Sequence, residues 1–190
     1  MVSEIGEGMT VRIDAKVEKA LREAIGNVPR AEPDQIAAPF AALDDRERAE
    51  ALALAVTVTC YVAIDVSDSQ WPVPASVRRI AEDLATTGTT AKRLGLDADE
   101  IHAYLSRTVL GPERLEDVIP DEPAFTRLPV IVAMQALAVY SPQGMGMWDY
   151  LDRIESAIEI AAALDASVLP AAVMRAYLPK PQAEGQAPGA

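Results

Sequence analysis

The sequence predicts an all-α protein, a compact bundle of about seven to nine helices. Half of the 190 residues are hydrophobic but only 5% are aromatic, so small aliphatic side chains supply a core in which helix axes approach closely. Apolar residues recur at helical spacing in most segments. Two stretches, 44–47 and 97–100, match the capping box that begins a helix.

The N-terminal half contains helices of different lengths. Asp14 is expected to cap a helix that runs to Ile25 and ends at Gly26. A short helical or irregular piece follows at 34–43 and is interrupted by Pro39. Residues 45–66 are expected to form one long helix.

The second half of that long helix, 51–66, also alternates as a strand would. A strand needs a partner, and the only candidate is the segment 10–17. No glycine or proline separates 51–66 from the helical residues before it. We therefore expect a helix there.

The C-terminal half is divided by prolines and glycines. Its expected elements are, in chain order, a loop at 70–74, a helix over 76–84, the segment 87–107, a break at Gly111 and Pro112, a short turn around Leu115, a central helix over 128–140, a loop at 141–146, and helices over 147–164 and 167–178. We expect one domain over 1–178, loosely ordered in 1–10, and a disordered tail over 179–190.

The formal net charge is −12, and it is spread evenly along the chain. Acidic and basic side chains number 11 and 7 in residues 1–60, 10 and 6 in 61–120, and 8 and 4 in 121–190, so each third carries −4. A uniformly acidic body favours solubility, repels phosphate backbones and attracts basic partners. The expected partner is therefore another protein, basic in character, rather than a nucleic acid.

The composition also predicts a cytoplasmic protein without a membrane segment. Residues 1–14 lack a basic region followed by a long apolar stretch, so no signal peptide is expected. The longest apolar run, 128–139, is broken by Gln135 and is too short to cross a bilayer. The single cysteine, Cys60, has no disulfide partner and is expected to be a small buried hydrophobic residue.

The segment 87–107 has the pattern of two short helices joined by a tight turn. Ala91 is small where two helices would cross, Gly95 lies where the turn needs a positive φ, and Ile101 is an inward aliphatic residue. Asp97 and Glu100 would start the second helix as a capping box. At this spacing the segment resembles the helix-turn-helix motif.

The charge of the second helix departs from that motif. The resemblance implies DNA contacts by Thr90, Lys92, Arg93, His102 and Arg107. The helix opens, however, with Asp97, Asp99 and Glu100, which would repel phosphates at the position where a DNA-reading helix meets them. A DNA-reading face is normally basic. We therefore favour a packing role for these helices.

Groups able to carry catalysis are scarce. His102 is the only histidine, and nothing in its sequence context activates it, so we expect it to lie on a helix surface or half-buried. One histidine and one cysteine make a zinc-type site improbable. The loop 144–147 lacks the lysine and the preceding strand of a phosphate-binding loop. No catalytic, metal or cofactor residue is assigned, and an enzyme is the less favoured class.

Four carboxylates recur at helical spacing near the C-terminal end of the chain. They are Asp149, Asp152, Glu155 and Glu159. A carboxylate metal site would need further ligands on a facing helix, and the Glu-x-x-His pair of such bundles is missing from the sequence. The pattern therefore predicts one solvated acidic helix face.

Both tryptophans lie where a predicted helix meets a loop. Trp71 belongs to a proline-rich loop, and Trp148 follows Met145 and Met147. Such residues are enriched in protein interfaces, so these four are the candidate partner-binding residues. The alternative is that the indoles close the ends of the bundle. Helical spacing with Leu151 favours that alternative for Trp148, whereas for Trp71 the two interpretations are balanced.

Three functions remain, in order of preference. The first is an acidic helical protein that binds another protein, as a regulatory adaptor or as an inhibitor, antitoxin or immunity-type partner of a basic protein. The second is a transcription regulator that uses residues 87–107. The third is a small-ligand binder or enzyme with a carboxylate-lined or apolar pocket between helices.

Overall fold

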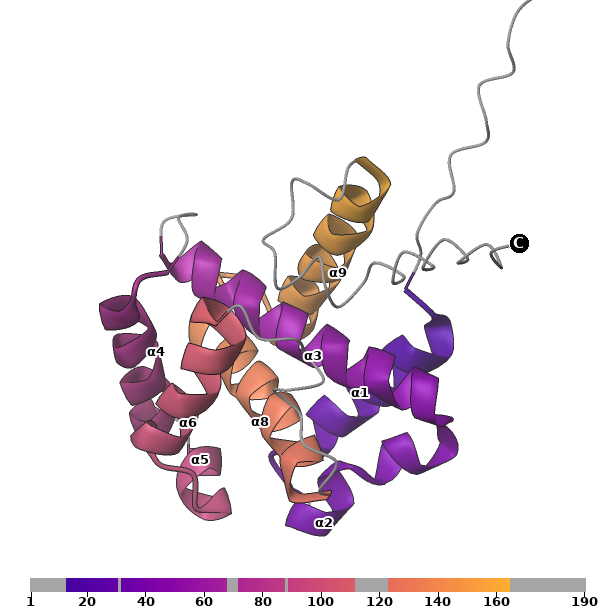
Figure 1. The fold of residues 1–190 in the computed structure, drawn as a ribbon, viewed down its shortest axis with the longest axis horizontal. Coiled ribbons are helices and arrows are strands. Elements are labelled where there is room, and N and C mark those ends of the chain that lie inside the picture. The colour runs from indigo at the N-terminus through magenta and orange to yellow at the C-terminus, as the bar shows by residue number, and fades with distance from the viewer. Residues whose placement is uncertain (1–12, 31, 68–71, 88, 112–122, 165–190) are drawn as a thin grey trace, which may run out of the picture.

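The computed structural model describes residues 13–30, 32–67, 72–87, 89–111 and 123–164. Every regular element in these ranges is helical, which confirms the all-α prediction (Figure 1). In chain order the elements are α1 (Ala15–Asn27), α2 (Pro33–Ile36), the 3-10 turn η1 (Ala38–Ala42), α3 (Asp45–Val66), α4 (Pro74–Thr87), α5 (Thr89–Leu94), α6 (Ala98–Leu105), the π-helical turn η2 (Ser106–Leu110), α8 (Pro123–Tyr140) and α9 (Met147–Leu164).

Some expectations fall outside the described residues. They concern the loose segment 1–10, Trp71, the turn around Leu115, the helix over 167–178 and the tail over 179–190.

α1 begins as predicted and ends slightly later. The Asp14 side chain accepts a hydrogen bond from Lys16 N at 2.7 Å and caps the helix. Gly26 does not end it, because the helix continues to Asn27, and the next N–H, from Val28, still bonds to carbonyl groups of the last turn.

α3 is helical throughout 51–66, as predicted. Its capping box is complete: Asp44 Oδ1 accepts from Glu47 N at 2.8 Å, and Glu47 Oε2 accepts from Asp44 N at 2.9 Å. Every residue from Ala51 to Cys60 is buried, so the helix is surrounded on all sides. The alternating β-branched residues therefore reflect burial on every face, and a two-sided sheet is not needed to explain them.

α3 is also the one helix in the described part of the chain that is long and apolar enough to cross a membrane. Of its apolar window, 67% is buried inside the protein. Such burial is typical of the core helix of a bundle.

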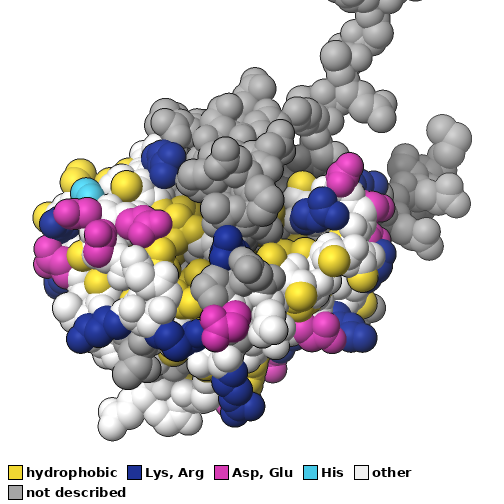
Figure 2. All heavy atoms as spheres, turned by 90° about the horizontal axis from the view of Figure 1, so that it is seen from below, with side chains coloured by type: hydrophobic (Ala, Val, Ile, Leu, Met, Phe, Trp, Pro, Cys, Tyr) yellow, Lys and Arg dark blue, Asp and Glu magenta, His cyan; other side chains and the backbone are white. Residues whose placement is uncertain are grey.

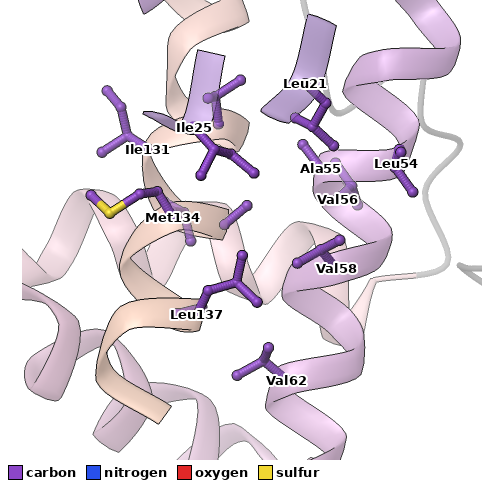
Figure 3. Packing of buried hydrophobic residues seen from close by; sticks show 14 of the residues in the cluster. Leu21, Ile25, Leu54, Ala55, Val56, Val58, Val62, Ile131, Met134 and Leu137 are labelled. Atoms are coloured by element: carbon purple, nitrogen blue, oxygen red, sulfur yellow. The ribbon is translucent and has the colours of Figure 1, made fainter. Parts of the chain in front are cut away.

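The core lies between α1, α3 and α8. Figure 3 shows Leu137 of α8 pointing toward Val58 of α3, with Ile25 of α1 between the two helices. α8 is buried without a break from Val130 to Leu137, as expected of a central helix. It shares that central position with α3, against which it packs.

The remaining helices cover this core. α4 is longer than the predicted 76–84, and its predicted inward residues, Val77, Ile80, Ala81 and Leu84, are all buried. Together α4, α5 and α6 flank α8 on one side, and α9 packs against α3 and α8. The C-terminal part of α9 rises beyond the bundle in Figure 1.

Candidate functional site

The segment 87–107 forms two helices, α5 and α6, joined by a turn. Gly95 adopts φ 72°, the left-handed region that glycine reaches without strain. Asp97 Oδ1 accepts from Glu100 N at 2.8 Å and caps α6, which is one of the two bonds of the predicted capping box. Ala91 and Ile101 are buried, as predicted. These contacts explain why the segment folds as two helices joined by a turn. They do not indicate that the segment binds nucleic acid.

The five candidate DNA-contacting residues do not share one solvent-facing environment. Arg93 Nη2 donates to a backbone carbonyl at the end of α1 at 2.5 Å, so its side chain reaches toward the body of the protein. Lys92 and Arg107 are exposed. Thr90 and His102 are half-buried.

The first turn of α6 is acidic on its exposed side. Asp97, Asp99 and Glu100 are exposed, and Arg78 of α4 donates to Asp99 Oδ1 at 2.7 Å. Partial burial, followed by the charge of Asp97, raises the pKa of Glu100 above its usual value. In Figure 2, Asp and Glu side chains gather beside the one histidine. This face therefore disfavours a phosphate backbone.

His102 and Cys60 lie in different surroundings. His102 Nε2 lies 3.4 Å from Ser106 Oγ, but Asp99, one turn earlier, is bonded to Arg78. Cys60 is fully buried, as predicted, and burial raises its pKa to about 12, so it is a neutral thiol at ordinary pH. Among the described residues, no group of three His, Cys, Asp or Glu side chains is placed to hold a metal ion.

The prediction of one solvated acidic face on α9 is wrong for Glu155. Asp149 and Asp152 are exposed, but the Glu155 side chain is only 8% exposed and is paired with Arg22 of α1. Glu159 is half-buried, and its Oε1 accepts from Ile13 N at 3.1 Å. With Asp152, which also pairs with Arg22, three of the four carboxylates join α9 to the N-terminal part of the described chain.

Arg22 of α1 is the residue that sequence analysis missed. Its guanidinium donates to Glu18 at 2.9 Å, to Asp152 at 2.6 Å, and to Glu155. Burial raises the pKa of Glu155 to about 7, although Arg22 acts in the opposite direction. Glu155 Oε1 has no hydrogen-bond partner among the described residues. One cation thus serves three carboxylates at the seam between α1 and α9.

Trp148 lies at the outer edge of this seam. The residue is 40% exposed, so part of the side chain is in contact with solvent. A methyl group at Gly26 of α1 would lie 3.9 Å from Trp148 Cζ2, which places the indole over a position without a side chain. Met145 and Met147 are half-buried and pack against the core.

The inward stripe of α9 contains Leu151, to which helical spacing linked Trp148, but Trp148 itself lies outside the stripe. The stripe consists of Tyr150, Leu151, Ile154 and Ile158, all buried. On the opposite side of α9, every fourth residue is exposed. These residues are Trp148, Asp152, Ser156 and Ile160, and we call them the outer face of α9.

Exposed large hydrophobic residues are concentrated on this outer face. In the described part of the chain they are Val73, at 56%, Trp148, at 40%, and Ile160, at 59%. Two of the three therefore belong to α9, at the two ends of one stripe. Contiguous exposed apolar patches mark interaction sites, and Trp148 and Ile160 are separated on α9 by about three helical turns.

Comparison with known proteins identifies no relative. No protein-family model matches the chain, and neither the search of curated proteins nor that of solved structures returns a similar protein.

Proposed function

We propose that this acidic helical protein binds another protein through the outer face of α9. One observation carries the proposal: Trp148 and Ile160, two of the three exposed large hydrophobic residues in the described part of the chain, both lie on α9, with the exposed Ser156 between them. Tryptophan anchors and partly exposed aliphatic residues supply much of the binding energy in protein interfaces.

The charge of the protein favours a basic partner. The net charge of −12 is spread along the whole chain, and Asp149 and Asp152 lie beside Trp148 on α9. Complementary charge accelerates encounter and selects against acidic competitors. This combination suits a regulatory adaptor, or an inhibitor, antitoxin or immunity-type partner of a basic protein.

The two alternatives lack a comparable observation. DNA binding by residues 87–107 would bring the exposed acids of α6 against phosphates, while Arg93 is directed to a carbonyl of α1. A carboxylate-based site would use Glu155, which is instead paired with Arg22. Protein binding therefore remains the preferred function.

Co-purification of tagged variants tests the proposal. Ile160→Asp places a charge on the outer face, and Val73→Asp is the matched control, because both residues are exposed to a similar degree, 59% and 56%. The wild type should recover a basic protein from cells of the source organism, and Ile160→Asp should reduce its recovery about tenfold or more. Val73→Asp should leave recovery unchanged.

Circular dichroism of both variants shows first that each remains folded. Equal recovery by Ile160→Asp and the wild type contradicts the proposal. Absence of any protein partner from all samples also contradicts it.

A further inference from the structure

We infer that Trp148 and the carboxylates beside it form a site for an arginine side chain of the partner protein. This inference rests on the proposed function and specifies the chemistry of one part of the outer face.

The indole is supported on one side by α1. A Cβ atom at Gly26 would lie 3.9 Å from Trp148 Cζ2, so the ring lies over the backbone of α1 at a position without a side chain. Because the residue keeps 40% of its surface, part of the ring remains available to a partner. An aromatic ring held in this way can bind a cation over its face with little loss of side-chain entropy.

The charge around the indole is suited to a cation. Asp152 lies one helical turn after Trp148, so the two side chains share a face, and Asp149 is the next residue after Trp148. Arg22 is shared among Glu18, Asp152 and Glu155, which leaves this group of carboxylates with more negative charge than Arg22 can balance. An arginine of the partner would supply a further positive charge and reduce that imbalance. The exposed Arg153 also lies on this part of α9.

Arginine fits this arrangement better than lysine does. A guanidinium is planar, so it can stack on an indole and donate hydrogen bonds from its edge to a carboxylate at the same time. Asp152 already accepts such a bond from Arg22 at 2.6 Å. Asp149 uses Oδ2 to accept from Gly146 N at 3.2 Å, and no described residue bonds to its Oδ1.

A fluorescence titration tests the inference. The protein carries Trp71→Phe, so that Trp148 is the only tryptophan that emits, since the chain has two. The probes are the peptide Gly-Arg-Gly-Arg-Gly and its lysine and citrulline counterparts, each with blocked ends. The arginine peptide should change the emission saturably, the lysine peptide should bind about three- to tenfold more weakly, and the neutral citrulline peptide should leave the emission unchanged.

Paired variants separate a local site from general attraction. Asp149→Asn with Asp152→Asn should weaken arginine-peptide binding about three- to tenfold. Asp99→Asn with Glu100→Gln removes the same charge from α6 and should leave binding unchanged. Binding is followed by the same titration, and circular dichroism verifies the fold of each variant.

Three results would overturn the inference. They are equal binding of the arginine and lysine peptides, an equal loss in the two double variants, and no change of Trp148 emission up to about 10 mM peptide. If any of these occurs while Ile160→Asp still abolishes co-purification, the proposed function stands and only the arginine site is wrong. If co-purification also fails, both proposals are wrong.

Discussion

The substitution Glu155→Gln should stabilise the protein above neutral pH. Glu155 is buried at the seam between α1 and α9, where its pKa is raised from 4.5 to about 7 by burial. A folded-state pKa above the unfolded one means that the folded protein holds a proton that the unfolded chain has released. Stability contributed by this group is therefore complete below about pH 4.5 and is lost as the pH rises through about 7.

The size of the effect follows from the pKa shift. A rise from 4.5 to about 7 corresponds to ~3 kcal/mol, at about 1.4 kcal/mol per unit. With 8% of the side chain exposed, solvent screens this group little. Glutamine keeps an acceptor for Arg22 and carries no charge, so Glu155→Gln should gain up to that amount at about pH 8 and almost nothing at about pH 4.

Thermal unfolding followed by circular dichroism at both pH values measures the difference. For a domain of this size ~3 kcal/mol raises Tm by about 6–12 °C. Glu18→Gln is the matched control, because it removes a more exposed carboxylate, 36% accessible, from the same guanidinium. The control should change the free energy of unfolding by less than about 1 kcal/mol at either pH.

The opposite result would refute the reasoning. If Glu155→Gln is less stable than the wild type at about pH 8, the ion pair with Arg22 outweighs the burial of the carboxylate. If the gain is the same at both pH values, the proton held by Glu155 is not its cause.

Three further predictions concern the core and the backbone. Leu54→Ala, in α3, should lower the free energy of unfolding, measured in urea, by about 2–5 kcal/mol, because the side chain is fully buried. Ile160→Ala, at an exposed position, should change it by less than about 0.5 kcal/mol. Similar losses in the two variants would contradict the burial pattern. Gly95→Ala should lower the free energy of unfolding by about 1–2 kcal/mol, because residue 95 has φ 72°. Gly26→Ala, within α1, should leave this free energy unchanged or raise it. If urea unfolding shows Gly26→Ala to be the more destabilising substitution, these backbone conformations are wrong. Cys60, whose pKa is raised to about 12 by burial, should react with an aromatic disulfide reagent at about pH 8 only after unfolding, and rapid reaction of the folded protein would contradict its burial.

Features with a local cause were predictable from the sequence. Asp14, Asp44 and Asp97 cap helices because an acceptor side chain at the start of a helix satisfies nearby N–H groups. The inward residues of α4 follow from helical periodicity alone. Even the ambiguous 51–66 segment was assigned correctly, because the chain offered no convincing partner strand.

The α1–α9 seam was not predictable, because its partners are distant in sequence. Arg22 and Asp152 are 130 positions apart, and no periodic pattern joins them. Helical spacing groups Glu155 with three other carboxylates. The burial of Glu155 depends on contacts that form only in the folded protein. Its pairing therefore depends on tertiary structure.

The orientation of Trp148 also depended on packing. Stripes beginning at Trp148 or at Tyr150 both include Leu151, Ile154 and Ile158, so spacing alone could not choose between them. Contacts with α3 and α8 select the stripe that contains Tyr150. The hydroxyl of Tyr150 then donates to Asp65 of α3 at 2.7 Å.

Site-specific photo-crosslinking in cells of the source organism tests the central claim most directly. A photoreactive residue replaces Ser156, on the outer face of α9, or Arg79, an exposed residue of α4. The proposal predicts a crosslink to a basic protein from position 156 and none to that protein from position 79. Crosslinking from 79 alone, from both positions equally, or from neither would contradict protein binding by the outer face of α9.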